Sequence, residues 1–600
     1  MTKLNLFPKK VQKFYWIVFI LLVFFCLWIN FTGASWVQRL YEQKDFGSLN
    51  KFSASSVDRT LEFYQGKIDD VWIGPVTNVV VHVLFLIFCL IYLQGASAKS
   101  FCFWTFLFLA VSKFNILFYP PYGDAIGGPF AEGLWLAKNN FNYAALFDQP
   151  GYNFGGPKAY FFSLYPTYLA VLYKLISSVP VFLLVNHFLV FLMCAVIVSL
   201  SRQIILKAGY DRTLAVFSAI CVLALPLFQS QTEAINMEMP CLLFSVLAVY
   251  DLINKKIGRA CLFAIIAAFV KGHGILICGT VFLVSVWLFL SDKDLKYKGR
   301  TILWGMTAIV FGTLLVLSKF LLKDQHAGMM KLFAGLPSLK IMYLPWFYFA
   351  AVVLFFGFVF WSNHGGKKIL SVLMNQYYTQ CVVFIAAGMW YVLFLNFYAV
   401  SPRYKLELAP FLLLALLFGV FSWVKIRKVL LAVMFLTVGV SSFASFGFFE
   451  KPVIPNYHIF SERSLEYRND LKLNVELAKF LEKDFKDYTI GAPFLMAQML
   501  AIPEFGYVAK PMDVVVYGMP IHYANIKNFE GLQKMNIMRT VWVAFACHFE
   551  NKNGTYYPIH PQDKVIREME LGENKLTLFM GGFAIEQRRQ LIEMIEKYKK

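Results

Sequence analysis

The stretch YPPYGDAIGGPFAEGLWLAKNN, residues 119–140, follows an apolar run and yet is rich in turn-forming and charged residues. Asp124 lies between a glycine and a Gly-Gly-Pro turn, and Glu132 follows it. A second Gly-Gly-Pro turn leads to Lys158 and then to an aromatic stretch that reaches Tyr173. Glycine and proline mark turns, and aromatic side chains gather where a membrane meets water. We interpret this segment as a structured loop on a membrane surface that presents a carboxylate.

The composition is that of a multi-pass membrane protein. Of the 600 residues, 58% are hydrophobic and only 15% are charged. The formal net charge of +20 would be compatible with a nucleic-acid partner. However, the Lys and Arg residues cluster in short segments between apolar runs, as the positive-inside bias predicts, so we predict no nucleic-acid partner. The ten cysteines lie mostly in or beside apolar runs and show no CxxC spacing, which argues against a disulfide framework.

The apolar runs predict an α-helical bundle with about thirteen transmembrane helices. The predicted spans are 13–33, 75–95, 101–118, 180–201, 213–229, 239–254, 259–271, 274–290, 301–321, 343–361, 379–398, 406–424 and 429–449. Residues 165–178 have a proline near the start and a lysine near the end, which favours an interfacial helix over a span. The basic loops place the N-terminus in the cytoplasm and the protein in the cytoplasmic (inner) membrane.

Four regions follow from this pattern. The predicted N-terminal helices occupy residues 1–118 with an outer loop at 35–73, the first catalytic outer loop is 119–179, the helix bundle is 180–450, and a soluble domain is 451–600. In the soluble region we predict helices at 473–486 and 584–599 and strands at 488–494, 541–545 and 575–582. Alternating helix and strand signals predict an α/β domain, and an odd number of spans places it outside the cytoplasm.

Several polar residues are candidates for chemistry. Asp124 could be a general base for an acceptor hydroxyl, or simply a turn-forming residue. Lys158 could hold a phosphate, or extend along the membrane surface. Glu132 could supply a second acid, or lie on a solvated helix face. Glu233 and Glu238, in the predicted outer loop 229–240, could bind acceptor or metal through their carboxylates, or be solvated.

Two further pairs of residues lie close to apolar spans. Lys271 and His273 occupy a turn inside an apolar stretch, where ionisable groups suggest function unless the turn reaches the outer surface. Arg403 and Tyr404 lie at the mouth of a span, and arginine suits phosphate contacts, although an interfacial anchor would look the same. We find no phosphate-binding GxxxxGK[ST], GxSxG or HExxH motif in a fitting context, so nucleotide and serine hydrolysis have no support.

The Pro-Pro-x-Gly-Asp loop, the amphipathic stretch after it and the interfacial helix resemble the first outer loop of GT-C membrane glycosyltransferases. They resemble most the protein O-mannosyltransferase and lipid A aminoarabinose transferase group, as does the stretch RYKLELAP at 403–410. The resemblance implies that Asp124 is the catalytic base, that Lys158 contacts the donor phosphate, and that Arg403 and Tyr404 bind the donor. The family's common Asp-Glu pair is Asp-Ala here, so a second acid would have to come from Glu132 or Glu233.

We therefore predict an inverting glycosyltransferase that moves a sugar from a polyprenyl-phosphate donor to a lipid, glycan or protein acceptor at the outer face of the membrane. The alternatives are a flippase or transporter of lipid-linked glycans and a glycan polymerase. A transporter would be expected to show paired halves with broken helices, which the sequence lacks. No cofactor is predicted, and the sequence leaves a divalent metal open.

Overall fold

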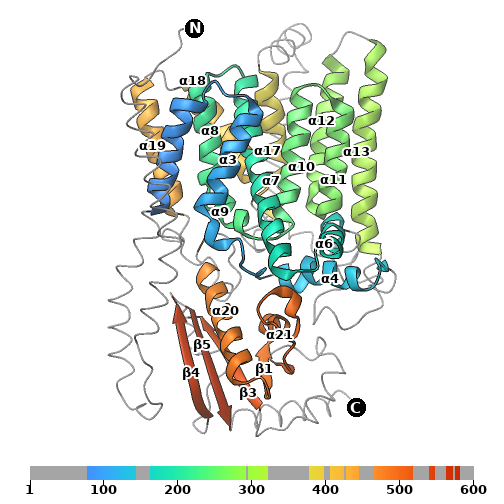
Figure 1. Cartoon of the computed structure of the whole chain (residues 1–600). Helices are drawn as coiled ribbons and strands as arrows, with labels where there is room; N and C mark the ends of the chain where they lie inside the picture. The colour runs from blue at the N-terminus through green and yellow to red at the C-terminus, as the bar shows by residue number, and fades with distance from the viewer. Residues whose placement is uncertain are drawn as a thin grey trace.

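In the computed structural model, the described part of the chain forms a helical bundle with a five-stranded β-sheet at one end (Figure 1). The described residues are 77–123, 125–143, 163–291, 295–321, 377–396, 406–423, 427–444, 465, 467–517, 540–547, 563–571 and 574–581. The predicted spans at 13–33 and 343–361, the loop at 35–73 and the closing helix at 584–599 lie outside them.

Apolar helices make up the bundle. They are, in chain order, Thr77–Leu93, α3 (Ala98–Ser112), α7 (Val179–Lys207), α8 (Arg212–Ala224), α9 (Pro226–Glu233), α10 (Glu238–Ile253), α11 (Ile257–Val270), α12 (Ile275–Ser291), α13 (Leu295–Leu321), α17 (Tyr378–Asn396), α18 (Ala409–Trp423) and α19 (Arg427–Ala444). Helices satisfy their own backbone hydrogen bonds, which a lipid surrounding requires. Large side chains such as Phe191, Phe217 and Trp390, each at most 2% exposed, fill the core between them.

Two of the described helices are long and apolar enough to cross a membrane, Val179–Lys207 and Gly272–Phe289. A third span results if α8 and α9, which meet at a 63° bend, are counted together. Pro226 begins α9, and its missing N–H and its ring interrupt the helix at that point. These helices identify the chain as a membrane protein, while the total of about thirteen spans stays a prediction.

Two short helices lie at the end of the bundle nearest the sheet (Figure 1). They are α4 (Ala131–Lys138) and α6 (Leu164–Leu175). The two helices pack closely at Gly133, where an added Cβ would lie 2.7 Å from the Cβ of Leu169. Helix α6 matches the helix predicted at 165–178, and its place at a membrane surface stays a prediction.

The sheet has the strand order β2-β1-β3-β5-β4 and is mixed. Strands β2 (Val514–Tyr517) and β3 (Thr540–Cys547) both pair with β1 (Thr489–Pro493) in parallel. Strand β5 (Asn574–Gly581) pairs antiparallel with β3 and with β4 (Asp563–Leu571). The three predicted strands are therefore present as β1, β3 and β5.

Two helices accompany the sheet. Helix α20 (Tyr467–Asp484) contacts β4 and β5, and α21 (Phe494–Ala501) contacts β1 and β2. Leu477, Ala478 and Leu481 of α20 lie on one face of the helix, with Leu481 four residues after Leu477 and three after Ala478, and all are buried, which is why the amphipathic pattern predicted a helix here. The α/β arrangement is thus present in the described residues, while its position outside the cytoplasm stays a prediction.

The turn between α11 and α12 depends on Gly274, in the short 3-10 helix η4 (Gly272–Gly274). A Cβ added at Gly274 would lie 2.3 Å from the backbone carbon of Ala267, whereas one added at Gly272 would meet nothing within 4 Å. We expect Gly274→Ala to lower the free energy of unfolding by about 1–3 kcal/mol because the backbone of α11 must move. Denaturant titration in detergent measures this loss, and Gly272→Ala is the matched control. Equal behaviour of the two variants would refute the packing argument.

Candidate functional site

A bend in the bundle brings a buried carboxylate to the end that faces the sheet. Helix α8 ends at Ala224, and the 63° bend redirects α9 so that it ends at Glu233. Glu233 is only 3% exposed. Of the two alternatives for Glu233 and Glu238, the solvated one is wrong, because both side chains are buried. The segment 229–240 is also largely helical, since α9 reaches Glu233 and α10 begins at Glu238.

Glu233 is held by two cations from distant parts of the chain. Arg468 of α20 donates from Nε to one carboxylate oxygen at 2.7 Å and from Nη2 to the other, so the pair is bidentate. Lys113, which follows α3, forms an ion pair with the same carboxylate and also reaches the backbone carbonyl of Gln229 at 3.5 Å. The Tyr467 hydroxyl lies 3.4 Å from Glu233 Oε2. One carboxylate therefore joins α3, α9 and α20.

The carboxylate of Glu233 raises the pKa of its partner Arg468. Burial by itself would lower the pKa of Arg468, but the neighbouring carboxylate of Glu233 opposes this, and the pKa ends above its usual value. Lys472 lies one helical turn further along α20, and burial together with the charge of Arg468 lowers its pKa. Arg468 and Lys472 thus place two cations one helical turn apart on α20, and Glu476 adds a carboxylate near Lys472.

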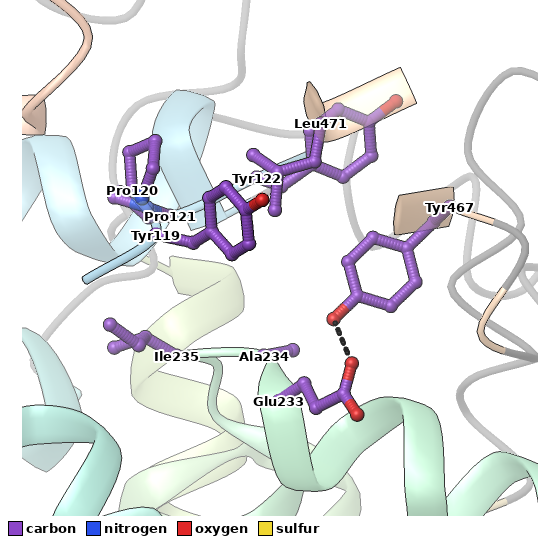
Figure 2. Close-up of a pocket in the computed structure, with 9 residues that line it drawn as sticks. All are labelled: Tyr119, Pro120, Pro121, Tyr122, Glu233, Ala234, Ile235, Tyr467 and Leu471. Atoms are coloured by element: carbon purple, nitrogen blue, oxygen red, sulfur yellow. Dashed lines mark hydrogen bonds between the residues drawn. The ribbon is translucent and has the colours of Figure 1, made fainter. Parts of the chain in front are cut away.

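A small pocket opens beside Glu233, and Figure 2 shows the side chains around it. Its lining residues are Tyr119, Pro120, Pro121, Tyr122, Glu233, Ala234, Ile235, Tyr467 and Leu471. The cavity volume is about 10 Å³, close to the space that one water molecule needs. The first four of these residues immediately precede the turn at Gly123, whose φ of 60° is the left-handed conformation that glycine adopts readily. Asp124 follows Gly123 in the sequence and itself lies outside the described residues.

A second buried cluster forms around Lys271. Its Nζ lies 2.8 Å from Glu407 Oε1 and 3.3 Å from Glu238 Oε1, and none of the three side chains is more than 7% exposed. Lys271 immediately follows α11, Glu238 begins α10, and Glu407 comes just before α18. Two carboxylates around one ammonium group thus join the start of α10, the end of α11 and the residues just before α18.

The remaining predicted site residues lie partly within the described part of the chain and partly outside it. Glu132 is 3% exposed, so the interpretation of a solvated helix face was wrong. His273 is partly exposed in η4 beside Lys271. The predicted residues that lie outside the described part of the chain are Asp124, Lys158, Arg403 and Tyr404.

The structure adds residues that the sequence did not suggest. Lys113, Arg468 and Tyr467 meet Glu233, and Glu407 meets Lys271. Glu407, just before the apolar run that begins at Leu408, and Lys271, just after the apolar helix α11, were visible signals in the sequence. Isolated charges beside apolar runs need partners. Arg468 gave no such signal, since α20 carries many charged residues.

Within the described ranges, no group of three or more His, Cys, Asp or Glu side chains could hold a metal ion. The two clusters around Glu233 and Lys271 consist of carboxylates and cations. Buried cations can bind an anion, and carboxylates can accept protons or hydrogen bonds from hydroxyl groups.

Comparison with known proteins gives one distant likeness to report. No family model matches the sequence, and no curated protein matches it either. Among solved structures, the chain is similar to ArnT from Cupriavidus metallidurans, determined with undecaprenyl phosphate bound. The two share 12% sequence identity at a TM-score of 0.41, over 79% of this chain and 98% of that one.

Proposed function

We propose that the protein is an inverting glycosyltransferase that uses a polyprenyl-phosphate sugar and acts at the outer face of the cytoplasmic membrane. The observation that carries this proposal is the position of the segment Tyr119–Tyr122. It leads directly into Asp124, and it lines a pocket beside a buried carboxylate and its cations where the helical bundle meets α20. A site at the end of a bundle can take the head group of a lipid whose chain lies between helices.

The roles follow from the chemistry of the transfer. Asp124 removes the proton of the acceptor hydroxyl while that oxygen attacks the anomeric carbon of the sugar. The bond from that carbon to the phosphate oxygen breaks, and the lipid phosphate leaves with additional negative charge. Lys158 and Arg403 stabilise that charge, and Tyr404 completes the donor site. Glu233 and Glu238 lie buried at the same end of the protein, and a second acid beside Asp124 would come from Glu132 or Glu233.

The buried cluster around Lys271 supports the assignment of the donor site. Through Glu407, it holds the segment that follows Arg403 and Tyr404 against α10 and α11. A phosphate-binding arginine needs a fixed backbone if its guanidinium is to meet the leaving group at the right place. In this proposal the extracytoplasmic domain, residues 451–600, and the loop at 322–342 frame the acceptor.

The deciding experiment uses membranes that contain the protein and a panel of radiolabelled polyprenyl-phosphate sugars. We expect label from one donor to move to a lipid, glycan or protein acceptor, and membranes from cells without the protein to show no transfer. Movement of the intact lipid between leaflets without transfer of label would instead identify a flippase. Extension of a lipid-linked glycan by whole repeat units would identify a polymerase.

A further inference from the structure

We propose that the segment 467–507, from α20 through η7 (Pro503–Phe505) to Tyr507, is a positioning element for the catalytic loop. It fixes the chain on both sides of Asp124, with Tyr507 and Arg468 as its positioning residues. The inference rests on the proposed function, because Asp124 is taken as the base of the transfer. It adds a role for a part of the chain that lies more than 300 residues away in the sequence.

Contacts on the first side of the loop involve residues just before Asp124. The Tyr507 hydroxyl donates a hydrogen bond of 2.7 Å to the backbone carbonyl of Pro121. Tyr507 is 2% exposed, so this hydroxyl has no access to bulk water as an alternative partner. The ring of Tyr467 stacks on Tyr122, with ring centroids 5.8 Å apart and an angle of 26° between the planes. Buried carbonyl groups need a partner, so this bond selects one position of the Pro121 backbone.

Contacts on the second side involve residues just after Asp124. The ring of Phe505 meets Phe130 edge to face at a centroid distance of 5.8 Å. Phe130 ends η3 (Ile126–Phe130), the helical turn that begins two residues beyond Asp124. Glu504 forms an ion pair with Lys138 at the end of α4. The same short segment of the C-terminal part therefore holds the chain before and after the predicted base.

Arg468 provides the third contact, which reaches the bundle itself. Its bidentate bond to Glu233 fixes α20 on α9, and Glu233 in turn is paired with Lys113. The Tyr467–Arg468 pair thus touches both the loop, through Tyr122, and the wall of the pocket, through Glu233. Such an arrangement keeps the distance between the loop and α9 constant.

A positioning role has a kinetic signature. Misplacement of a catalytic group by about 1 Å can cost about 10²-fold in rate even when the substituted residue is remote from the chemistry. Tyr507 touches the loop through the backbone carbonyl of Pro121, and in the proposed mechanism the contacts to the donor phosphate belong to other residues, Lys158 and Arg403. Loss of its hydroxyl should therefore reduce kcat and leave the KM for the lipid-linked donor unchanged. A purely structural defect would instead lower the amount of folded protein and leave the kcat of the folded fraction unchanged.

The test compares Tyr507→Phe with Tyr488→Phe in the full-length protein. Tyr488 follows α20, and its ring packs against Phe485 at the end of that helix. We expect Tyr507→Phe to lower kcat by about 10- to 100-fold with KM for the donor within twofold of wild type, and Tyr488→Phe to behave as wild type. In parallel, hydrogen–deuterium exchange of peptides from residues 119–130 should become faster in Tyr507→Phe only, while peptides from α7 keep their rates.

The two readouts separate failure of this inference from failure of the proposed function. Unchanged exchange in residues 119–130 would overturn the inference whatever the activity. Faster exchange with unchanged kcat would show that the loop is held but that its position does not govern transfer, which also overturns it. If the wild type transfers no sugar from any donor, the proposed function fails, and faster exchange would still support the positioning of the loop by Tyr507.

Discussion

Replacement of Asp124 by asparagine should reduce sugar transfer by about 10²- to 10⁴-fold, the range that a general base contributes. Asparagine keeps the size of the side chain and its ability to form turns, but its amide cannot take a proton from the acceptor hydroxyl. The acceptor oxygen would then have to attack as a neutral hydroxyl. The measurement is kcat for transfer from the labelled donor in membranes with equal amounts of wild type and variant.

Asp148→Asn is the matched control, because Asp148 is a second acid of the same outer region and is interpreted as a turn residue in FDQPGY. We expect its kcat to stay at the wild-type value. Binding of the donor lipid should be unchanged in Asp124→Asn, since the phosphate contacts are assigned to Lys158 and Arg403. Full activity of Asp124→Asn would remove this carboxylate from the mechanism and leave it as a turn residue.

The positions of the elements were predictable because they depend on local periodicity. The apolar run predicted at 180–201 corresponds to α7, and the runs at 239–254 and 274–290 correspond to α10 and α12. The apolar face of 473–486 became α20 in the same way. The sequence analysis missed the strands β2 (Val514–Tyr517), which has only four residues, and β4 (Asp563–Leu571), which carries many charges. It also missed the break between α8 and α9, which depends on how Pro226 packs in the bundle.

The environment of the acids could not be predicted, because their partners are remote in the sequence. Glu233 meets Arg468 across a separation of 235 residues, and Lys271 meets Glu407 across 136. An acid in a short segment between apolar runs looks solvated until such a partner is known. A buried carboxylate without a cation would be costly, so burial and pairing arise together from the tertiary fold. This is why the sequence alone left Glu233 open between a functional carboxylate and a solvated one.

The largest stability effect that we expect is that of Glu233→Gln. The amide preserves the shape of the side chain but removes the charge that compensates Lys113 and Arg468. The side chain of Lys113 is 6% exposed and that of Arg468 is 22% exposed, so water can solvate only part of the remaining positive charge. Breaking a buried ion pair from one side costs about 3–5 kcal/mol, and we expect a loss near the lower end because of the partial exposure of Arg468.

A second ion pair between the bundle end and the C-terminal part provides the control. Lys138 and Glu504 are 43% and 20% exposed, and such a pair contributes about 0–1 kcal/mol. Denaturant titration in detergent should therefore show a much smaller loss for Glu504→Gln, and raising the salt concentration should weaken only this exposed pair. Adding Lys113→Met to Glu233→Gln should restore part of the lost stability, because it removes one of the two uncompensated buried cations. Equal losses for Glu233→Gln and Glu504→Gln would mean that Glu233 does not join the bundle to α20 in the folded protein.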